Sequence, residues 1–475
     1  MKGYDLVIRN GTVVTASDTT ICDIGIRDGR IVALGESLDA GKEEIEASGH
    51  YVLPGGVDAH CHFDQPSGPG IQMADDFETG TRSAACGGTT TVIPFAAQQK
   101  GDTLRATVED YHRRADGKAC VDYAFHLIVS DVTPLVLKEE LPSLIEEGYT
   151  SFKIYMTYDD LKLDDREILE TLAVARQEGA MTMIHAENAD CIAWLSDALE
   201  AAGQTAPRFH ATSRPPVVER EATHRAISFA ELVDTPVLIV HVSGQEPIEQ
   251  IRWAQGRGLR VYAETCPQYL FLTADDLELD GFEGAKCVCS PPPRDARSQE
   301  AVWEALENGV FQIFSSDHAP FRYEDAEGKK SAEGKSFKHI PNGIPGVETR
   351  LPLLFSEGVL KGRIDITKFV ALTSTNPARI YGLYPRKGTL AVGSDADVVI
   401  WDPTLEWTIT NDRLHHNVDY TPYSGMTLTG KPITTLLRGQ VVWKDNIFIG
   451  GPGEGRFLPC ERPQPAMPKG VSKGF

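Results

Sequence analysis

The sequence predicts an α/β protein that consists of a (β/α)8 TIM barrel and a β-sandwich domain formed from both termini. Between residues 54 and 385, short apolar segments alternate with longer stretches of helical periodicity, and eight of these segments have the length of strands. Strand signals without intervening helices come before and after this region. Eight strands that alternate with helices are typical of a closed parallel barrel. An open doubly wound sheet is the alternative, but no G-x-G-x-x-G turn follows the first apolar segment.

The start of the chain has the pattern of short strands joined by tight turns. Asn10-Gly11 between two apolar runs is a strong hairpin signal, and Asp28-Gly29 repeats it. Comparable strand signals return near the end of the chain. A discontinuous sandwich domain made from residues 1–53 and 386–475 would bury the apolar faces of both ends at once. Residues 54–385 then form the barrel domain.

The eight predicted barrel strands are short apolar runs. They are predicted at residues 56–60, 89–95, 123–129, 151–155, 181–185, 237–241, 260–264 and 311–315. Most spacings leave room for a helix, as a parallel connection requires. Residues 166–176, for example, show the 3.6-residue apolar period of a helix that packs on one face.

Composition and charge exclude several classes of partner. The 475 residues carry 46 Lys and Arg against 68 Asp and Glu, and the resulting formal charge of -22 repels nucleic acid and anionic membrane surfaces. The chain shows no signal-peptide pattern and no run of about 18 apolar residues, which predicts a cytoplasmic protein. Nine cysteines, an odd number, favour free thiols over a disulfide framework.

The chain is organised around His60 and His62, which stand at the end of the first predicted barrel strand. Alternate residues of a strand point to the same face, so the two imidazoles can hold one metal ion between them. An isolated His-x-His is more often a solvated strand end. The metal hypothesis therefore depends on further ligands from other strands.

Further side chains of ligand type follow four other predicted strands. The active site of a barrel lies at the C-terminal ends of its strands, so these side chains should converge at one mouth. Each alone has an ordinary explanation, such as a solvated lysine, a core histidine or a helix cap. Together, imidazoles and a carboxylate suit Zn²⁺ or a similar divalent ion. The predicted metal ligands are His60, His62, Lys153, His185, His241 and Asp317.

Lys153 is the unusual member of this set, because an ammonium group repels a cation. Reaction of its amine with CO₂ would give a carbamate, N6-carboxylysine, whose two oxygens can bridge two metal ions. We therefore expect His60 and His62 to bind one ion. His185 and His241 are expected to bind the other. Two ions about 3.5–4 Å apart can activate water at neutral pH and polarise a substrate carbonyl.

Motifs along nearly the whole chain resemble one enzyme family. The matching segments are residues 54–62 (PGGVDAHCH), 75–81 (DDFETGT), 87–90 (GGTT), 151–153 (SFK), 185–187 (HAE), 241–243 (HVS), 315–318 (SSDH), 341–346 (PNGIPG) and 419–423 (DYTPY). They resemble the amidohydrolase superfamily and, within it, the cyclic amidases called dihydropyrimidinases and D-hydantoinases. The His-x-His pair is moderately specific, whereas the lysine, Pro-Asn-Gly and C-terminal motifs are diagnostic.

The resemblance implies a hydrolase with a binuclear zinc centre in which Lys153 is carboxylated. It further implies that Tyr158 donates to the developing oxyanion, and that Ser290 and Asn342 hold the ring amide of the substrate through backbone groups. The reaction would open a 5,6-dihydropyrimidine or hydantoin to the N-carbamoyl amino acid, with Asp317 as the proton shuttle. The family forms homotetramers, so the expected partners are a small cyclic ureide and further copies of the chain, without nucleic acid or membrane.

Three other functions are weighed against this one. An allantoinase, or another cyclic ureide or imide hydrolase, is the first, but allantoinases typically have Asn at the position of Asp64 and lack the tyrosine. A dihydroorotase would have an arginine there, and Asp64 is expected to repel its anionic substrate. A non-catalytic dihydropyrimidinase-like scaffold loses metal ligands, whereas all six candidates are present here.

Three neighbouring features are interpreted as structural. His318 follows Asp317 and is expected to point away from the mouth. The charged segment 323–338 is expected to be a surface loop by composition. The close pair Cys287 and Cys289 is expected to be buried free thiols and not a zinc site.

Overall fold

The structure is a computed structural model that describes residues 3–467. One of its two sheets is a nearly closed parallel barrel in which every predicted barrel strand has a counterpart. The strand order follows the sequence, except that the short β8 pairs with β7 beside the main ring. Cys61 at the end of the first strand pairs with His318 after the last, which brings the two edges together. The barrel strands are β6 (Gly56–Cys61), β7 (Thr89–Ala97), β8 (Asp122–Tyr123), β9 (His126–Ile128), β10 (Ser151–Tyr155), β11 (Met181–His185), β12 (Val237–Ile239), β13 (Val261–Thr265) and β14 (Ile313–Phe314).

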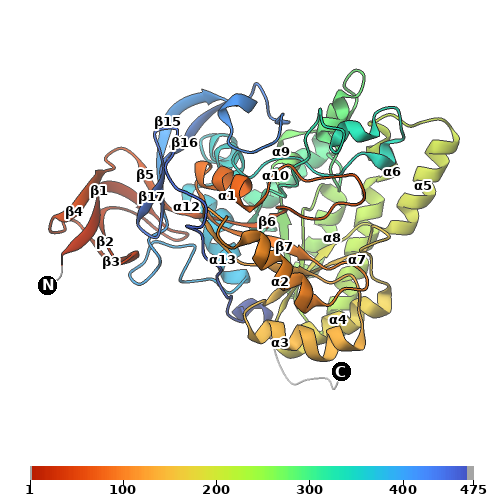
Figure 1. Cartoon of the computed structure of the whole chain (residues 1–475), viewed down its shortest axis with the longest axis horizontal. Helices are drawn as coiled ribbons and strands as arrows, with labels where there is room; N and C mark the ends of the chain where they lie inside the picture. Colours follow the sequence, from red (N-terminus) through yellow and green to blue (C-terminus); the bar gives the residue numbers. More distant parts are fainter. Residues whose placement is uncertain (1–2, 468–475) are drawn as a thin grey trace.

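Helices pack around the outside of the barrel (Figure 1). The longest, α4, α5 and α7, lie between β10 and β12 along the chain. The α-helices are α1 (Phe77–Cys86), α2 (Leu104–Ala115), α3 (Leu141–Glu146), α4 (Asp165–Glu178), α5 (Ala189–Ala201), α6 (Phe209–Ser213), α7 (Pro216–Val233), α8 (Gln245–Gly256), α9 (Gln268–Phe271), α10 (Ala296–Glu307), α11 (Arg350–Leu354), α12 (Ile366–Val370) and α13 (Asn376–Ile380).

Helix α4 shows how the local sequence sets these elements. Asp164 accepts the backbone N–H of Glu167, whose carboxylate accepts the backbone N–H of Asp164 in return, so the helix start is capped on both sides. Ile168 and Leu172, one helical turn apart, are both buried. Gly179 ends the helix with a left-handed φ of 69°, a conformation that glycine adopts without strain.

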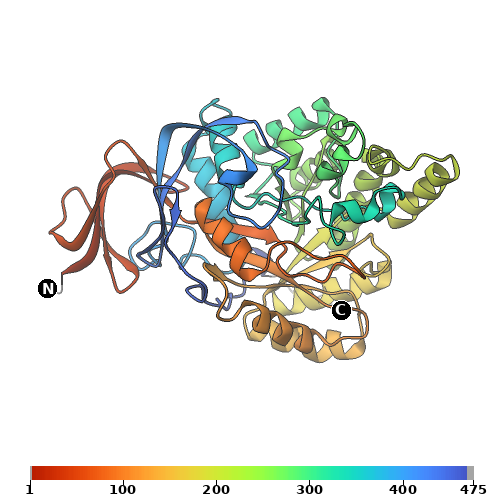
Figure 2. The same cartoon turned by 45° about the horizontal axis from the view of Figure 1, so that its top comes forward.

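The second sheet joins the two ends of the chain. Strands β5 and β15 pair antiparallel, which places Val52 opposite Ile400 and makes one sheet from both termini. Figures 1 and 2 show the red N-terminal strands and the blue C-terminal strands side by side at one end of the barrel. The strands of this sheet are β1 (Tyr4–Val14), β2 (Thr19–Arg27), β3 (Arg30–Gly35), β4 (Gly41–Glu46), β5 (Tyr51–Pro54), β15 (Val398–Thr408), β16 (Thr427–Leu437), β17 (Gln440–Lys444) and β18 (Ile447–Phe448).

The predicted fold class, a (β/α)8 barrel with a separate β-domain built from both termini, is confirmed. The division of the chain at residues 53/54 and 385/386 stays a prediction. Residues 1–2 and 468–475, which that division assigns to the β-domain, lie outside the described part of the chain. Within residues 3–467, no helix has the length and apolar character needed to cross a membrane. The nine cysteines are all free, and Cys287 and Cys289 are buried, as predicted.

The hairpin predicted at Asn10-Gly11 is wrong. Strand β1 continues through both residues, and its register against β2 shifts there, so the pair forms a bulge and not a turn. Asn10 adopts a left-handed φ of 56°, and Asp23 Oδ1 accepts its backbone N–H at 3.0 Å. At Gly11, a Cβ atom would lie 2.3 Å from the Val52 side chain, so the close packing of β5 requires glycine. The second predicted turn, Asp28-Gly29, does join β2 to β3.

Candidate active site

One cavity at the C-terminal ends of the barrel strands brings the predicted site residues together. It has a volume of about 390 Å³. His60 alone is absent from its wall, because it is fully buried with Nε2 2.9 Å from the amine of Lys153. The other predicted residues, all in the wall, are His62, Lys153, Tyr158, His185, His241, Ser290, Asp317 and Asn342.

The imidazoles of this site face inward in two pairs. Asp317 Oδ1 lies 3.1 Å from His60 Nε2 and 3.5 Å from His62 Nε2. Ligand atoms of these three residues all lie within 4.8 Å of one another, close enough to share one ion. His185 Nδ1 and His241 Nε2 are 2.9 Å apart, so one ion between them would meet both nitrogens.

Oxygen acceptors on the far side of three imidazoles decide which nitrogen faces the cavity. Each acceptor keeps the proton on the outer nitrogen, and the lone pair of the inner nitrogen is left free for a cation. The pairs are His60 Nδ1 with Glu264 Oε1 at 2.6 Å, His62 Nδ1 with Gln65 Oε1 at 2.7 Å and His185 Nε2 with Glu187 Oε2 at 2.8 Å. The donor set and its orientation therefore fit a divalent metal ion.

Burial and neighbouring charges shift the pKa values of the site. Burial lowers the pKa of Lys153 to about 8. It also lowers the pKa of His62 and His241. Burial by itself would raise the pKa of Asp317, but the charge and hydrogen bond of His60 hold it well below its usual range. The pKa of His60 is raised, because the surrounding carboxylates outweigh burial and the charge of Lys153. An ionised carboxylate among imidazoles is the donor set that a divalent cation requires.

Tyr158 and Asn342 face each other across the cavity. Asn342 Nδ2 lies 3.4 Å from the Tyr158 hydroxyl, which therefore accepts from the amide and can donate its own proton elsewhere. The Tyr158 ring lies edge-on to His185 with centroids 5.5 Å apart. Arg214 lies 5.7 Å from the Tyr158 ring, and Ser290 lines the same cavity. A hydroxyl donor thus stands next to the inward-facing imidazoles.

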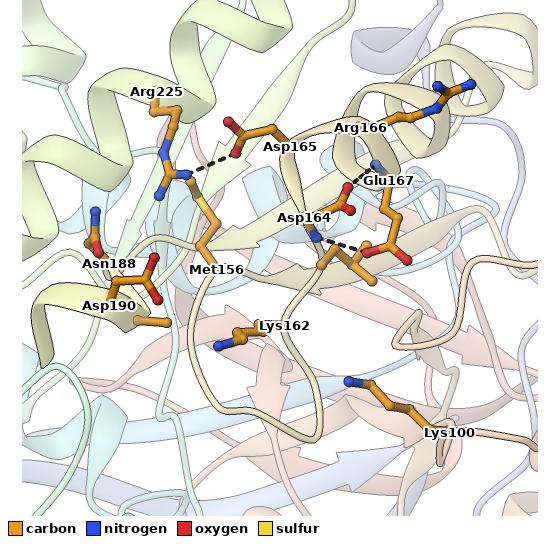
Figure 3. A pocket seen from close by; sticks show the side chains of 12 residues that line it. Lys100, Met156, Lys162, Asp164, Asp165, Arg166, Glu167, Asn188, Asp190 and Arg225 are labelled. Carbon is orange, nitrogen blue, oxygen red and sulfur yellow. Dashed lines mark hydrogen bonds and ion pairs between the residues drawn. The ribbon is translucent and has the colours of Figure 1, made fainter. Parts of the chain in front are cut away.

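A larger cavity, of about 650 Å³, lies beside the loop that carries Tyr158. Met156 and Lys162 belong to this loop and line the larger cavity, whereas Tyr158 lines the smaller one. Figure 3 shows a wall of mixed charges in which Arg225 pairs with Asp165 at 2.8 Å. Neither cluster of potential metal ligands among the described residues lies in this wall. The chemistry is therefore assigned to the smaller cavity.

The expectation that Asp64 repels an anionic substrate is wrong, because its side chain does not face the cavity. The Asp64 carboxylate lies 3.3 Å from the Arg114 guanidinium and is not part of the cavity wall. Its charge is therefore turned to Arg114 and does not face a substrate. The next residue, Gln65, does line the cavity and binds His62.

Several buried residues that support the site were not predicted. Glu264 ends a predicted strand, so the rule that identified the other strand-end residues applies to it as well. Glu187 stands two residues after His185 and could have been found from that spacing. Arg214, which lies 3.2 Å from Glu187, has no signal in the sequence.

The surface-loop prediction for residues 323–338 is only partly correct. Tyr323, Lys329 and Phe337 are buried and anchor the segment. The Lys329 amine donates to the backbone carbonyls of Val288 at 2.8 Å and Pro341 at 2.7 Å. These carbonyls immediately precede the segments that carry Ser290 and Asn342. Lys329 therefore connects this segment to the cavity wall, although the charged composition of the segment predicts exposure.

The chain is similar to known proteins over nearly its whole length. Residues 51–442 match the model of the Amidohydrolase family. A D-hydantoinase of Geobacillus stearothermophilus is 48% identical over 455 residues, which cover 95% of this chain and 96% of that protein. A D-hydantoinase of Rhizobium radiobacter is 46% identical over 454 residues, which cover 95% of this chain and 98% of that protein. The crystal structure of dihydropyrimidinase from Brevibacillus agri NCHU1002 matches with a TM-score of 0.94 at 45% identity, covering 98% of this chain and 99% of that one.

Proposed function

This chain belongs to the amidohydrolase family, in the branch of the D-hydantoinases and dihydropyrimidinases, and from this membership we propose that it hydrolyses a cyclic ureide. The substrate is a 5,6-dihydropyrimidine or a hydantoin, and the product is the N-carbamoyl amino acid. The observation that carries the proposal is the convergence of imidazoles, Lys153, Asp317 and Tyr158 on one cavity of about 390 Å³. This volume falls in the range of small-molecule sites, about 300–1,000 Å³.

The family has a divalent metal centre, and we assign its ligands to the inward-facing side chains of this cavity. His60 and His62 would hold one Zn²⁺ ion together with Asp317. His185 and His241 would hold a second. When bound, the ions would activate a water molecule at neutral pH and polarise the amide carbonyl.

Lys153 is proposed to carry a carboxyl group, as N6-carboxylysine. Its amine lies between the rings of Phe95 and Tyr155, at 4.4 and 4.8 Å from their centroids, and close to His60. An ammonium ion there would repel two metal ions, whereas a carbamate offers them two oxygens. Carbamate formation joins the amine nitrogen to the carbon of CO₂ and releases one proton to solvent.

The protein side chains supply proton transfer and orientation. Asp317 takes the proton of the attacking water and delivers it to the leaving ring nitrogen. The Tyr158 hydroxyl donates a hydrogen bond to the oxyanion that develops on the attacked carbonyl. The backbone groups of Ser290 and Asn342 hold the ring amide, so that the carbonyl faces both Tyr158 and Asp317.

A substrate panel tests this proposal. Initial rates should be measured on dihydrouracil, dihydrothymine, hydantoin, both enantiomers of a 5-substituted hydantoin, allantoin and dihydroorotate, with metal analysis of the same sample. We expect turnover of dihydropyrimidines or hydantoins and bound zinc. Preference for allantoin or dihydroorotate would contradict the assigned substrate class. Protein that stays inactive after addition of Zn²⁺ and bicarbonate would indicate a non-catalytic scaffold.

The homotetramer and the cytoplasmic location stay predictions.

A further inference from the structure

Cys86, Glu348 and His415 form a second group of side chains that can bind metal. Cys86 is the last residue of α1, Glu348 lies just before α11, and His415 follows the short helix η8 (Asn411–Arg413). One ligand atom of each lies within 4.8 Å of the other two. Among residues 3–467, this geometry recurs only in the group of His60, His62 and Asp317. None of the three residues lines the barrel cavity.

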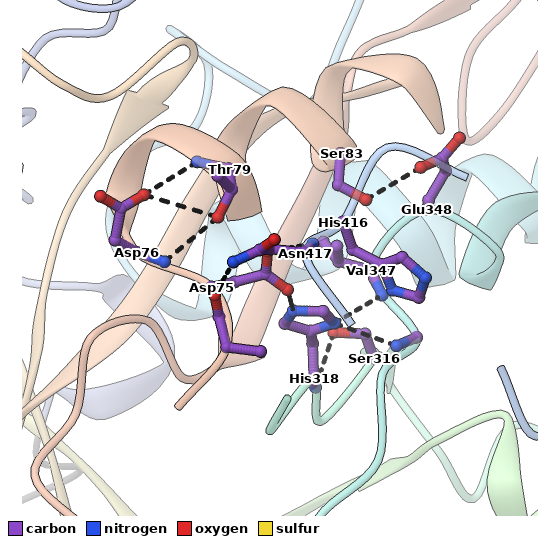
Figure 4. Close-up of polar contacts among 12 residues, drawn as sticks. Asp75, Asp76, Thr79, Ser83, Ser316, His318, Val347, Glu348, His416 and Asn417 are labelled. Atoms are coloured by element: carbon purple, nitrogen blue, oxygen red, sulfur yellow. Dashed lines mark hydrogen bonds and ion pairs between the residues drawn. The ribbon is translucent and has the colours of Figure 1, made fainter. Parts of the chain in front are cut away.

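Glu348 is held in place by its neighbours. Its Oε2 accepts from the Ser83 hydroxyl at 2.9 Å (Figure 4) and from the backbone N–H of His415 at 2.8 Å. Its Oε1 lies 2.9 Å from His415 Nδ1. The His415 ring packs edge-on against Trp443, with centroids 5.0 Å apart. Two of the three ligands are therefore oriented in advance, which lowers the cost of binding an ion.

The chemistry of the group suits Zn²⁺, which takes sulfur, nitrogen and oxygen ligands in tetrahedral sites. The contact between His415 Nδ1 and Glu348 Oε1 holds one proton between the two atoms. Zn²⁺ would take the place of the proton at Nδ1, which would move to Nε2 of the same ring, and the Cys86 thiol would lose its own, so one proton passes to solvent. Burial holds the pKa of the Cys86 thiol well above its usual range, so a thiolate forms only with a cation beside it.

A separate cavity gives access to this group. It has a volume of about 490 Å³ and includes all three residues in its wall, which leaves room for a water molecule as fourth ligand. Arg413 and Lys431 line the same cavity. The Lys431 amine is engaged elsewhere, because it donates to Asn446 Oδ1 at 2.6 Å and lies 5.0 Å from the centroid of Trp407. The two positive charges still oppose a metal ion, so binding here should be weaker than at the barrel centre.

We propose that Cys86, Glu348 and His415 bind one Zn²⁺ ion at a site separate from the barrel centre. The ion cross-links α1, the segment before α11 and the segment after η8, which are distant in sequence. Because Asn342 lies in the segment that leads to Glu348, the ion also stiffens one wall of the barrel cavity. This zinc site would be present whichever cyclic ureide the barrel cavity binds.

Cobalt substitution tests this site with a signal that the barrel centre does not produce. The predicted ligands of the barrel centre are imidazoles, a carboxylate and a modified lysine, whereas Cys86 supplies a thiolate. Full-length protein with Co²⁺ in place of Zn²⁺ should show a near-ultraviolet thiolate-to-cobalt charge-transfer band. Cys86→Ser should remove this band and one equivalent of metal per chain while turnover persists. Cys191→Ser changes an exposed thiol and should keep the band.

His415→Gln is a second variant that leaves the packing of α1 untouched. At a fixed Co²⁺ concentration it should weaken the band. Zn²⁺ added to protein whose barrel centre is already loaded should raise the melting temperature of the wild type but of neither variant. A wild-type protein without the band would overturn the proposal. So would a band that survives in Cys86→Ser, because the thiolate would then come from another cysteine.

Discussion

His318 and Asp75 form a buried contact of 3.1 Å between Nε2 and Oδ2, behind the strand end that carries the proposed proton shuttle (Figure 4). The other ring nitrogen, Nδ1, accepts the backbone N–H of Gly346 at 3.0 Å and of Val347 at 3.3 Å. Nε2 therefore carries the proton and donates it to Asp75. The His318 carbonyl accepts the backbone N–H of His62 at 2.7 Å, so one residue ties a metal-ligand candidate to two other segments.

His318→Gln should loosen the metal centre although His318 lies outside the cavity. Glutamine cannot both accept the two backbone N–H groups and reach Asp75, so the backbone around His62 and the neighbouring aspartate is less fixed. Loss of such a supporting contact typically lowers metal affinity by about 10–100-fold. Competition with a chelator measures this affinity. His224→Gln, which changes a histidine on the outer face of α7, is the control, and equal affinity in both variants would contradict the role given to His318.

Asp317→Asn should retain the fold and most of the bound metal but lose turnover. The amide cannot accept the proton of the attacking water, and general acid–base catalysis contributes about 10²–10⁴-fold to a rate. Steady-state kinetics should show the loss in kcat, while metal analysis shows that the imidazoles still bind. Asp160→Asn changes another acid of the same cavity wall and should stay close to wild type. Turnover of Asp317→Asn near the wild-type rate would remove this residue from the mechanism.

Activation of metal-free protein should require CO₂ as well as Zn²⁺ if Lys153 forms a carbamate. Zn²⁺ with bicarbonate should restore activity faster than Zn²⁺ in CO₂-depleted buffer. Lys153→Met should fail to regain activity or to hold two metal ions under either condition. Lys338→Met is a matched control, because Lys338 lines the same cavity but its amine pairs with Asp197 and Glu200. Equal activation rates with and without bicarbonate would contradict the carbamate.

Tyr158→Phe should lower kcat with a small change in KM. The phenyl ring keeps the shape of the cavity but cannot donate to the oxyanion, and removal of one such donor costs about 10²–10³-fold in kcat. Tyr262→Phe removes a hydroxyl from the half-buried Tyr262 of β13, outside the cavity wall, and serves as control. A large rise in KM with unchanged kcat would instead assign Tyr158 to ground-state binding.

The sequence predicts the barrel and its strand-end residues because both follow from short-range rules. Alternation along a strand places His60 and His62 on one face, and the barrel topology brings His185 and His241 to the same end. The cavity in the structure collects all of these except the fully buried His60. The same rule would have added Glu264, which ends its predicted strand as His185 does.

The features that the sequence did not predict depend on contacts between segments that are distant in the chain. A local sequence pattern does not indicate such contacts. Asp64 turns to Arg114, 50 residues further along the chain. Arg214 reaches Glu187 only because α6 and the strand ends pack together. Asn10-Gly11 has the local chemistry of a hairpin, but pairing with β2 on both sides of the bulge continues strand β1 through these residues. In each case a contact with a residue distant in sequence determines the local conformation.

Lys329 is the clearest example, since its charge predicts exposure and the structure buries it completely. Burial lowers its pKa to about 7 from the usual 10.5. Between these two values the unfolded chain binds a proton at Lys329 that the folded chain does not, so the contribution of Lys329 to the free energy of unfolding rises with pH. The neighbouring thiols Cys287 and Cys289 stay protonated in the folded chain, because burial raises the pKa of both, so in the upper part of this window they contribute with the opposite sign.

Lys329→Met should therefore lower the slope of the free energy of unfolding against pH between about 7 and 10, relative to the wild type. Methionine keeps much of the side-chain volume but cannot bind the carbonyls of Val288 and Pro341, so the melting temperature should also fall at every pH. KM should rise more than kcat falls, because those carbonyls position the segments of Ser290 and Asn342. Thermal melts across this pH range and steady-state kinetics measure both effects. Lys335→Met, at an exposed position of the same segment, should reproduce the wild-type pH slope, and an equal slope in Lys329→Met would show that Lys329 does not titrate in this window.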